Sequence, residues 1–398
     1  MNLISATVFV GFAVVLLAVS SFVDGRPGDL NLNDDLNRDF YKEVKQLLDS
    51  AYDKQRRSSA ETRASELFYN EQPREVTQKP PRPVEVPGWP KTELAVGQIT
   101  AVSINSKGQP VIFHRGTVVW DEGSFNTTYN YQRAQQGPIA EDTVFTLDEN
   151  TGAVLSSWGG GMFYMPHGLT VDQYDNVWVT DVALHQVFKF TPNVEFPTLT
   201  LGVRFQPGTR LPHLCQPTSV AISRTREEQI FVADGYCNNR LLQYTKHGEL
   251  IRVIPQPPEF LSLQVPHSLA LVESLDMICV ADRENMRIAC PRAGLREVDL
   301  VTRSAPAYTI HQPDLGRVFA VASYGDLVYA VNGPTSPMIP IQGFTIDPRT
   351  ETVIDHWAPT SHAFANPHGL AVNPDGSAMY VAEIGPNRLW KFMLNATE

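Results

Sequence analysis

From about residue 96 onward, short apolar stretches alternate with polar turns along the chain. The stretches at 176–179, 230–232, 277–280 and 379–381 recur at intervals of about 50 residues or a multiple of that length. Turn sequences such as Asp375-Gly376 separate them, and the region shows no clear helix pattern. Repeats of this length that consist of short strands are typical of propeller blades with four strands each.

A short phrase marks the start of several repeats. Pro-His-Gly-Leu or Pro-His-Ser-Leu occurs at 166–169, 266–269 and 367–370. A fourth copy begins at Pro217 and has threonine in place of histidine; further repeats begin near Ala101 and, in a degenerate form, around Gly316. These six starts predict an all-β fold, a six-bladed β-propeller with about 50 residues in each repeat.

The histidines of the three phrases, His167, His267 and His368, fall in every second repeat. Alternate blades of a six-bladed ring stand a third of a turn apart, and the first strand of each blade lines the central channel. The three imidazoles are therefore expected to converge on the axis. Three neutral imidazoles with a fourth position open form the donor set of a catalytic zinc site. The alternative is that each histidine only packs against a neighbour or caps a turn.

The composition is that of a folded protein, and it argues against nucleic acid as a partner. Of the 398 residues, 42% are hydrophobic and 19% charged, which argues against a wholly disordered protein. The net charge of -11, without a basic stripe, makes nucleic acid an unexpected partner.

The first 95 residues differ from the rest. An uncharged apolar run at 5–19 predicts a signal peptide over 1–25, with an uncleaved anchor as the alternative. Residues 26–95 are predicted to be a partly disordered pro-region or linker. This segment is expected to form one amphipathic helix, followed by the dibasic pair Arg56-Arg57 and a proline-rich stretch at 80–90 that is expected to be an extended spacer. The propeller is expected over 96–394, and the mature protein is expected not to be bound to a membrane.

Secretion changes how the cysteines are interpreted. In an oxidising compartment the four cysteines allow three pairings. Local pairing is the simplest choice, and a four-cysteine zinc site is the rival, although no CxxC spacing supports it. Local pairing joins Cys215 to Cys237 and Cys279 to Cys290. Two glycosylation sequons, at Asn126 and Asn395, fit the same compartment.

Several segments together resemble one enzyme family. They are FHRGTVVW at 113–120, the three histidine phrases, FVADGYCNNR at 231–240 and CVADRENMRIAC at 279–290. This set resembles the peptidyl-α-hydroxyglycine α-amidating lyases of peptidylglycine amidation, over residues 95–392 or thereabouts. The oxidative domain of bifunctional relatives is expected to have no counterpart in residues 26–95, which are too few to fold one.

The resemblance implies NHL-like blades and a zinc-dependent lyase. Such an enzyme cleaves the N–Cα bond of a C-terminal peptidyl-α-hydroxyglycine to give a peptide α-amide and glyoxylate, in the maturation of neuropeptides and peptide hormones. A separate monooxygenase would supply the substrate. A monomer in secretory granules or outside the cell is expected.

The resemblance also implies residue roles. The three histidines become zinc ligands, Tyr236 in GYCN becomes the catalytic base, and the disulfides follow the local pairing. Arg115 in HRG and Arg283 in ADREN become the cationic groups around the substrate carboxylate and the tyrosine. A phenol, with an ordinary pKa of about 10, is a poor base at neutral pH unless cations lie nearby.

A structural calcium ion is implied as well, bound by the carbonyl groups of Val102 and Leu169. Here the chain departs from the family, because Gly369 stands where the family has an aspartate. Loss of that carboxylate is expected to weaken binding of a hard cation.

Two other functions compete with the lyase. One is a non-catalytic, secreted NHL-type propeller that binds a protein partner, which needs no axial histidines. The other is a calcium-dependent lactonase-like hydrolase, which needs several acidic residues in the channel.

Overall fold

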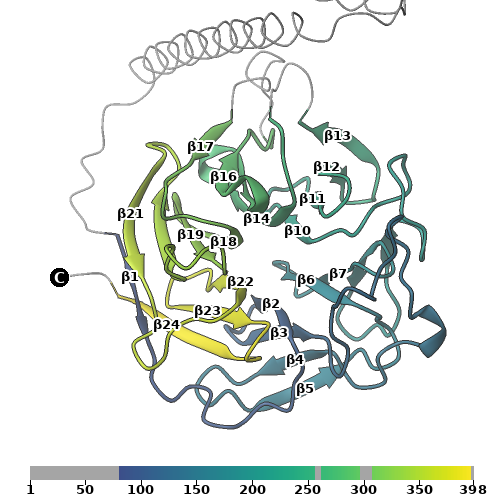
Figure 1. Ribbon diagram of the computed structural model, residues 1–398, viewed down its shortest axis with the longest axis horizontal. Coiled ribbons are helices and arrows are strands. Elements are labelled where there is room, and N and C mark those ends of the chain that lie inside the picture. Colours follow the sequence, from purple (N-terminus) through teal and green to yellow (C-terminus); the bar gives the residue numbers. More distant parts are fainter. Residues whose placement is uncertain (1–79, 256–260, 296–306, 396–398) are drawn as a thin grey trace, which may run out of the picture. The chain divides into compact units, whose positions relative to one another are not determined.

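A computed structural model describes residues 80–255, 261–295 and 307–395. Six four-stranded antiparallel sheets surround one axis, with the first strand of each sheet nearest the centre (Figure 1). The predicted six-bladed β-propeller is therefore confirmed. The expected signal peptide, the amphipathic helix and Arg56-Arg57 lie outside the described residues.

The strands of the six blades follow one order from the axis outward. The first strands are β2 (Ile99–Ile104), β6 (Pro166–Val171), β10 (Ser219–Ile222), β14 (Pro266–Val272), β18 (Val318–Tyr324) and β22 (Pro367–Val372). The second strands are β3 (Pro110–His114), β7 (Val177–Asp181), β11 (Gln229–Asp234), β15 (Met277–Asp282), β19 (Leu327–Asn332) and β23 (Ala378–Glu383).

The outer half of each blade is built in the same way. The third strands are β4 (Val144–Leu147), β8 (Gln186–Phe190), β12 (Arg240–Thr245), β16 (Arg287–Cys290), β20 (Gly343–Asp347) and β24 (Leu389–Asn395). The outermost strands are β5 (Val154–Trp158), β9 (Leu199–Leu201), β13 (Leu250–Ile254), β17 (Tyr308–Ile310), β21 (Thr352–Trp357) and β1 (Arg82–Glu85). The helices of the described residues are three short 3-10 turns, η1 (Ala134–Gln136), η2 (Glu273–Leu275) and η3 (Arg283–Asn285), and none of them is long enough to cross a membrane.

The hydrophobic core is divided among the gaps between blades. Six buried clusters lie one between each pair of neighbouring blades. In β11, Ile230 and Val232 pack toward blade 2, whereas Phe231 and Ala233 pack toward blade 4. Because successive side chains of a strand point to opposite faces, one fully apolar strand serves two gaps. This explains the unbroken apolar stretches in the sequence.

A buried polar residue ends the second strand of five blades, and in four of them it holds the connection that leads into the first strand. Asp181, for example, is fully buried and accepts hydrogen bonds from the backbone N–H groups of Tyr164 and Met165, directly before β6. Asp234, Asp282 and Glu383 do the same before β10, β14 and β22, and these contacts fix where the four first strands begin. In blade 5 Asn332 instead hydrogen-bonds to Pro340 and Gln342, in the connection after β19.

The N-terminal boundary of the propeller differs from the prediction. Strand β1 pairs antiparallel with β24 and completes blade 6, so the propeller begins no later than Arg82 rather than at residue 96. Trp89 is 6% exposed and packs against Tyr380 in the core between blades 6 and 1. The segment at 80–90 thus supplies the strand that closes the ring and is not a spacer. Its proline-rich composition did not predict a strand, but proline is tolerated on an edge strand such as β1.

We expect Trp89→Ala to lower the free energy of unfolding by about 3–5 kcal/mol, since it leaves a cavity in a closed core. Denaturant unfolding of the full chain measures this. Val154→Ala, at a side chain 45% exposed on β5, is the control and should change stability by less than about 0.5 kcal/mol. An equal, small change in the free energy of unfolding for both variants would show that residues 80–90 contribute nothing to the core.

Candidate active site

The three histidines stand at the beginning of β6, β14 and β22. In each of these strands the pairing with the second strand is irregular at this point: the register shifts between Pro166 and Leu169, between Pro266 and Leu269, and between Pro367 and Gly369. A bulge of this kind redirects a side chain out of the regular alternation. The three histidines offer one nitrogen each within 4.8 Å of one another. The sequence-predicted convergence is therefore present in the structure.

A backbone carbonyl group fixes the orientation of each imidazole. Nδ1 of His167 donates to the carbonyl of Thr218 at 2.8 Å, Nδ1 of His267 to that of Phe319 at 2.6 Å, and Nδ1 of His368 to that of Thr100 at 2.7 Å. A carbonyl can only accept, so the proton of each neutral ring is on Nδ1 and the lone pair is on Nε2. Such contacts are the usual support of a metal-binding histidine.

The three carbonyl groups come from the blades that lack an axial histidine. Thr100, Thr218 and Phe319 occupy, in their own repeats, the position that histidine occupies in the other three. Each histidine therefore contacts the equivalent residue of the next blade around the ring. The alternation seen in the sequence has a structural reason: one blade supplies the ligand and the next supplies the group that orients it.

Burial keeps the three imidazoles neutral. Each of the three histidines is at most 5% exposed. Burial lowers the pKa of His167 and His267 well below the usual value and that of His368 to about 3. The positive charge of Arg283 acts in the same direction on all three, and that of Arg115 on His167 and His368. Three neutral nitrogen donors suit a zinc ion. Among the described residues no other group of three or more histidine, cysteine, aspartate or glutamate side chains is arranged for a metal.

Tyr236 places a hydroxyl group against these nitrogen atoms. Its oxygen lies 3.0 Å from Nε2 of His167 and 3.3 Å from Nε2 of His267. The residue follows β11, and Gly235 before it allows the loop to approach, since a Cβ there would lie 2.4 Å from Cγ2 of Thr218. Nη1 of Arg283 lies 3.4 Å from the hydroxyl oxygen and completes a cluster of the predicted residues.

Arg115 lies near this cluster without touching the tyrosine. It is 2% exposed, donates from Nε to the carbonyl of Pro166 at 2.9 Å, and burial lowers its pKa to about 10. The Trp120 ring contacts both residues: its centroid lies 5.5 Å from Cζ of Arg115 and 4.8 Å from the tyrosine ring centroid. Trp120 belongs to the segment that carries the resemblance, but nothing in the sequence distinguished it.

Arg115 and Arg283 occupy equivalent positions in two blades. Each directly follows the last residue of a second strand, His114 in blade 1 and Asp282 in blade 4. Blades 1 and 4 face each other across a ring of six, so the two cations approach the axis from opposite sides. This symmetry could have been found in the sequence by aligning the ends of the second strands.

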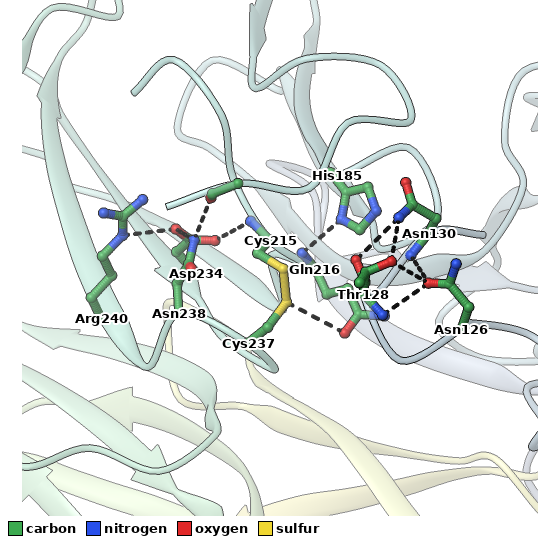
Figure 2. Close-up of a disulfide and its surroundings, with 11 residues drawn as sticks. Asn126, Thr128, Asn130, His185, Cys215, Gln216, Asp234, Cys237, Asn238 and Arg240 are labelled. Carbon is green, nitrogen blue, oxygen red and sulfur yellow. Dashed lines mark hydrogen bonds and ion pairs between the residues drawn. A yellow bond between two sulfur atoms is a disulfide. The ribbon is translucent and has the colours of Figure 1, made fainter. Parts of the chain in front are cut away.

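The disulfide between Cys215 and Cys237 anchors the loop that carries Tyr236. Figure 2 shows the disulfide beside Asp234, which accepts hydrogen bonds from the backbone N–H of Cys215 and from the side chains of Asn238 and Arg240. The second disulfide joins Cys279 to Cys290 on β15 and β16. Both follow the local pairing predicted from the sequence.

Comparison with known proteins agrees with this arrangement. A model of the NHL repeat matches residues 163–190. Peptidyl-alpha-hydroxyglycine alpha-amidating lyase 2 of Drosophila melanogaster is 55% identical over 318 residues, which make up 79% of this chain and 76% of that protein. The chain belongs to the peptidyl-alpha-hydroxyglycine alpha-amidating lyase family.

Two further relatives show how the lyase family varies in length. A probable peptidyl-alpha-hydroxyglycine alpha-amidating lyase of Caenorhabditis elegans is 38% identical, with 75% of this chain and 83% of that protein covered. Peptidylglycine alpha-amidating monooxygenase of Rattus norvegicus is 41% identical over 77% of this chain, but this match spans only 31% of the rat protein. The chain thus corresponds to about a third of the longer relative.

The two disulfides of this lyase family member should differ in their effect on activity. Replacing either cysteine pair by alanine removes a crosslink, over 22 residues for Cys215–Cys237 and 11 for Cys279–Cys290, worth on the order of 3 kcal/mol. Only loss of the first bridge should also reduce lyase activity under conditions where both variants are folded, because only that bridge adjoins Tyr236. Equal activity losses would contradict the anchoring role.

The calcium ion implied by the resemblance does not fit the residues present. Val102 and Leu169 line a small cavity of about 40 Å³ beside the histidines, and none of the residues around this cavity carries a carboxylate. At Gly369 a Cβ would lie 2.9 Å from Cα of Ala101, so the two backbones are in close contact where the family's carboxylate would be. Calcium prefers carboxylate oxygens among its ligands, and this lining does not offer one.

Proposed function

We propose that this chain is a zinc-dependent lyase that cleaves the N–Cα bond of a C-terminal peptidyl-α-hydroxyglycine. The products are a peptide α-amide and glyoxylate. The observation that carries the proposal is the position of the Tyr236 hydroxyl, which contacts Nε2 of both His167 and His267 and Nη1 of Arg283. A tyrosine oxygen, two imidazole nitrogens and a guanidinium group meet there at the mouth of the channel.

His167, His267 and His368 would hold the zinc ion through Nε2. A zinc ion bound there supplies Lewis acidity, which makes a nearby hydroxyl group more acidic. The chain's own residues prepare this site by keeping each proton on Nδ1, since the carbonyl groups of the three alternating blades accept hydrogen bonds from the Nδ1–H groups. The arrangement leaves three lone pairs directed at one point.

In the reaction the hydroxyl proton of the substrate moves to the departing nitrogen and the C–N bond breaks. The reacting carbon of the substrate carries a hydroxyl group, a carboxylate and the amide nitrogen. The Tyr236 oxygen, in its anionic form, accepts the hydroxyl proton while the C=O bond forms and the C–N bond breaks. The resulting phenol returns the proton to the departing nitrogen. Atoms and electrons balance without an oxidant, and one side chain acts first as the base and then as the acid.

The two arginines stabilise negative charge in the site in different ways. The Arg283 side chain is 16% exposed and lies 3.4 Å from the tyrosine oxygen, so it can contact a substrate carboxylate and balance the negative charge on Tyr236. Arg115 is buried beside Trp120 and acts as a fixed positive charge near the tyrosine. This divides the roles that the resemblance assigned to both.

The setting of the enzyme is proposed to be the secretory pathway, in granules or outside the cell, where it acts as a monomer in neuropeptide and peptide hormone maturation. Two disulfides suit that compartment. Asn126 is exposed, and its Oδ1 accepts a hydrogen bond from the hydroxyl of Thr128 in the same sequon, which suits glycosylation; Asn395 ends β24. A separate monooxygenase would provide the hydroxylated substrate.

The direct test is incubation of the purified protein with a synthetic peptide that ends in α-hydroxyglycine. Glyoxylate and the peptide amide should form in equal amounts, and the same peptide ending in unmodified glycine should not react. A folded, zinc-containing preparation that releases no glyoxylate would overturn the proposal and favour a partner-binding propeller.

A further inference from the structure

We propose that blade 5, the degenerate repeat, positions Arg283 for catalysis. The Phe319 ring, seated on Gly333, and the ion pair of Glu284 with Arg317 hold the guanidinium group against Tyr236. This inference rests on the proposed function, because it assigns positioning residues to the arginine of that site. None of these four residues is among those predicted from the sequence.

The guanidinium group of Arg283 contacts two aromatic rings. Its Cζ is 5.2 Å from the ring centroid of Tyr236 and 5.2 Å from that of Phe319. A cation over an aromatic face is attracted by the ring, so both rings stabilise this position of the group. The Phe319 ring therefore supports Arg283 where it contacts the tyrosine.

A carboxylate fixes the remaining rotation of the guanidinium group. Nε of Arg283 donates to Oε1 of Glu284 at 2.9 Å, and Nε of Arg317 donates to Oε2 of the same carboxylate at 3.0 Å. With Nε occupied, the Nη side of the group is directed to the tyrosine hydroxyl, which Nη1 reaches at 3.4 Å. Arg317, directly before β18, thus holds Glu284 from the neighbouring blade.

Gly333 makes room for the aromatic ring. A Cβ at this position would lie 2.5 Å from Cε2 and 2.7 Å from Cδ2 of Phe319, closer than carbon atoms pack. Gly333 follows the last residue of β19, the position at which blades 1 and 4 carry Arg115 and Arg283. Blade 5 therefore has no side chain at the position of the arginines, and the Phe319 ring occupies the space.

Phe319 contacts both Arg283 and the histidine cluster. Its carbonyl accepts a hydrogen bond from Nδ1 of His267, and its ring centroid lies 5.2 Å from that of His267 and 5.9 Å from that of His368. A substitution of the side chain keeps the carbonyl but removes these ring contacts together with the contact to Arg283. Zinc content and the Arg283→Ala background are therefore needed to separate effects on Arg283 from effects on the histidines.

The test is a pair of double-mutant cycles on the full-length, zinc-containing enzyme. Glu284→Gln and Phe319→Leu should each lower kcat/KM for a peptidyl-α-hydroxyglycine, Phe319→Leu by roughly tenfold as expected for loss of a partly desolvated cation–π contact. In an Arg283→Ala background both costs should largely disappear, because the group that they position is gone. Asp326→Asn is the matched control for the glutamate: Asp326 also pairs with an arginine, Arg349, but at the opposite mouth of the channel, and kcat/KM should not change.

Gly333→Ala provides a second arm, since it displaces the Phe319 ring without altering it, and its cost should also vanish when Arg283 is alanine. Costs that persist unchanged in the Arg283→Ala background, or single substitutions without effect, would overturn the inference while leaving the lyase assignment intact. If the wild-type enzyme itself releases no glyoxylate, the proposed function fails instead. Zinc content, measured for every variant, should match the wild type.

Discussion

Replacing Tyr236 by phenylalanine should lower kcat by about 10²-fold or more, with little change in KM. The substitution removes the oxygen that contacts His167 and His267 and that serves as base and acid, and general acid–base groups contribute on that scale. The ring itself stays, so its contacts with Trp120 and Arg283 are preserved. Steady-state release of glyoxylate at saturating substrate measures the effect.

Tyr164→Phe is the matched control for this prediction. Its hydroxyl lies 3.3 Å from Arg204 in the same aromatic region, and none of its described contacts involves a histidine of the cluster. It should retain near-normal turnover. Zinc content should be the same in both variants. If Tyr236→Phe turned over substrate at the wild-type rate, the tyrosine would have no part in proton transfer.

Replacing His267 by alanine should abolish most zinc binding and, with it, the lyase activity. Changes to groups that only orient a metal ligand cost about 10- to 100-fold, so loss of a direct ligand should cost more. The blades should remain folded, because the core lies between the sheets and not at the axis. Elemental analysis and the glyoxylate assay, performed on the same preparation, measure both effects.

His356→Ala controls for the loss of an imidazole. His356 is on outer strand β21, where it contacts Asp314, away from the axis. This variant should bind one zinc ion per chain and remain active. A His267→Ala protein with undiminished zinc would show that the metal binds elsewhere or that two histidines suffice.

The sequence predicted those parts of the fold that repeat. Three first strands begin with the same phrase and a fourth with a close copy, so the number of blades and the meeting of the three histidines followed from spacing alone. Strand β1 has no such equivalent in composition. Its inward positions are Pro83 and Glu85, and the glutamate is held by Thr360 and Ser361, which no apolar pattern could reveal.

The rest of the site depends on contacts that leave little trace in one sequence. Thr218 and Phe319 orient histidines through carbonyl groups, a role that does not require a particular side chain. Tyr236 and Arg283 were assigned only through the family resemblance, because the reach of a loop after a second strand is not set by periodicity. Arg115 was likewise assigned through the resemblance, as one of two cationic groups around the substrate carboxylate and the tyrosine; in the structure it is buried beside Trp120.

The position of the metal in crystals of the full chain tests the central claim most directly. Anomalous scattering at the zinc absorption edge should give one peak per chain on the propeller axis, about 2.0–2.1 Å from Nε2 of His167, His267 and His368. No peak at that point in crystals of zinc-containing protein, or a peak held by other side chains, would contradict the account.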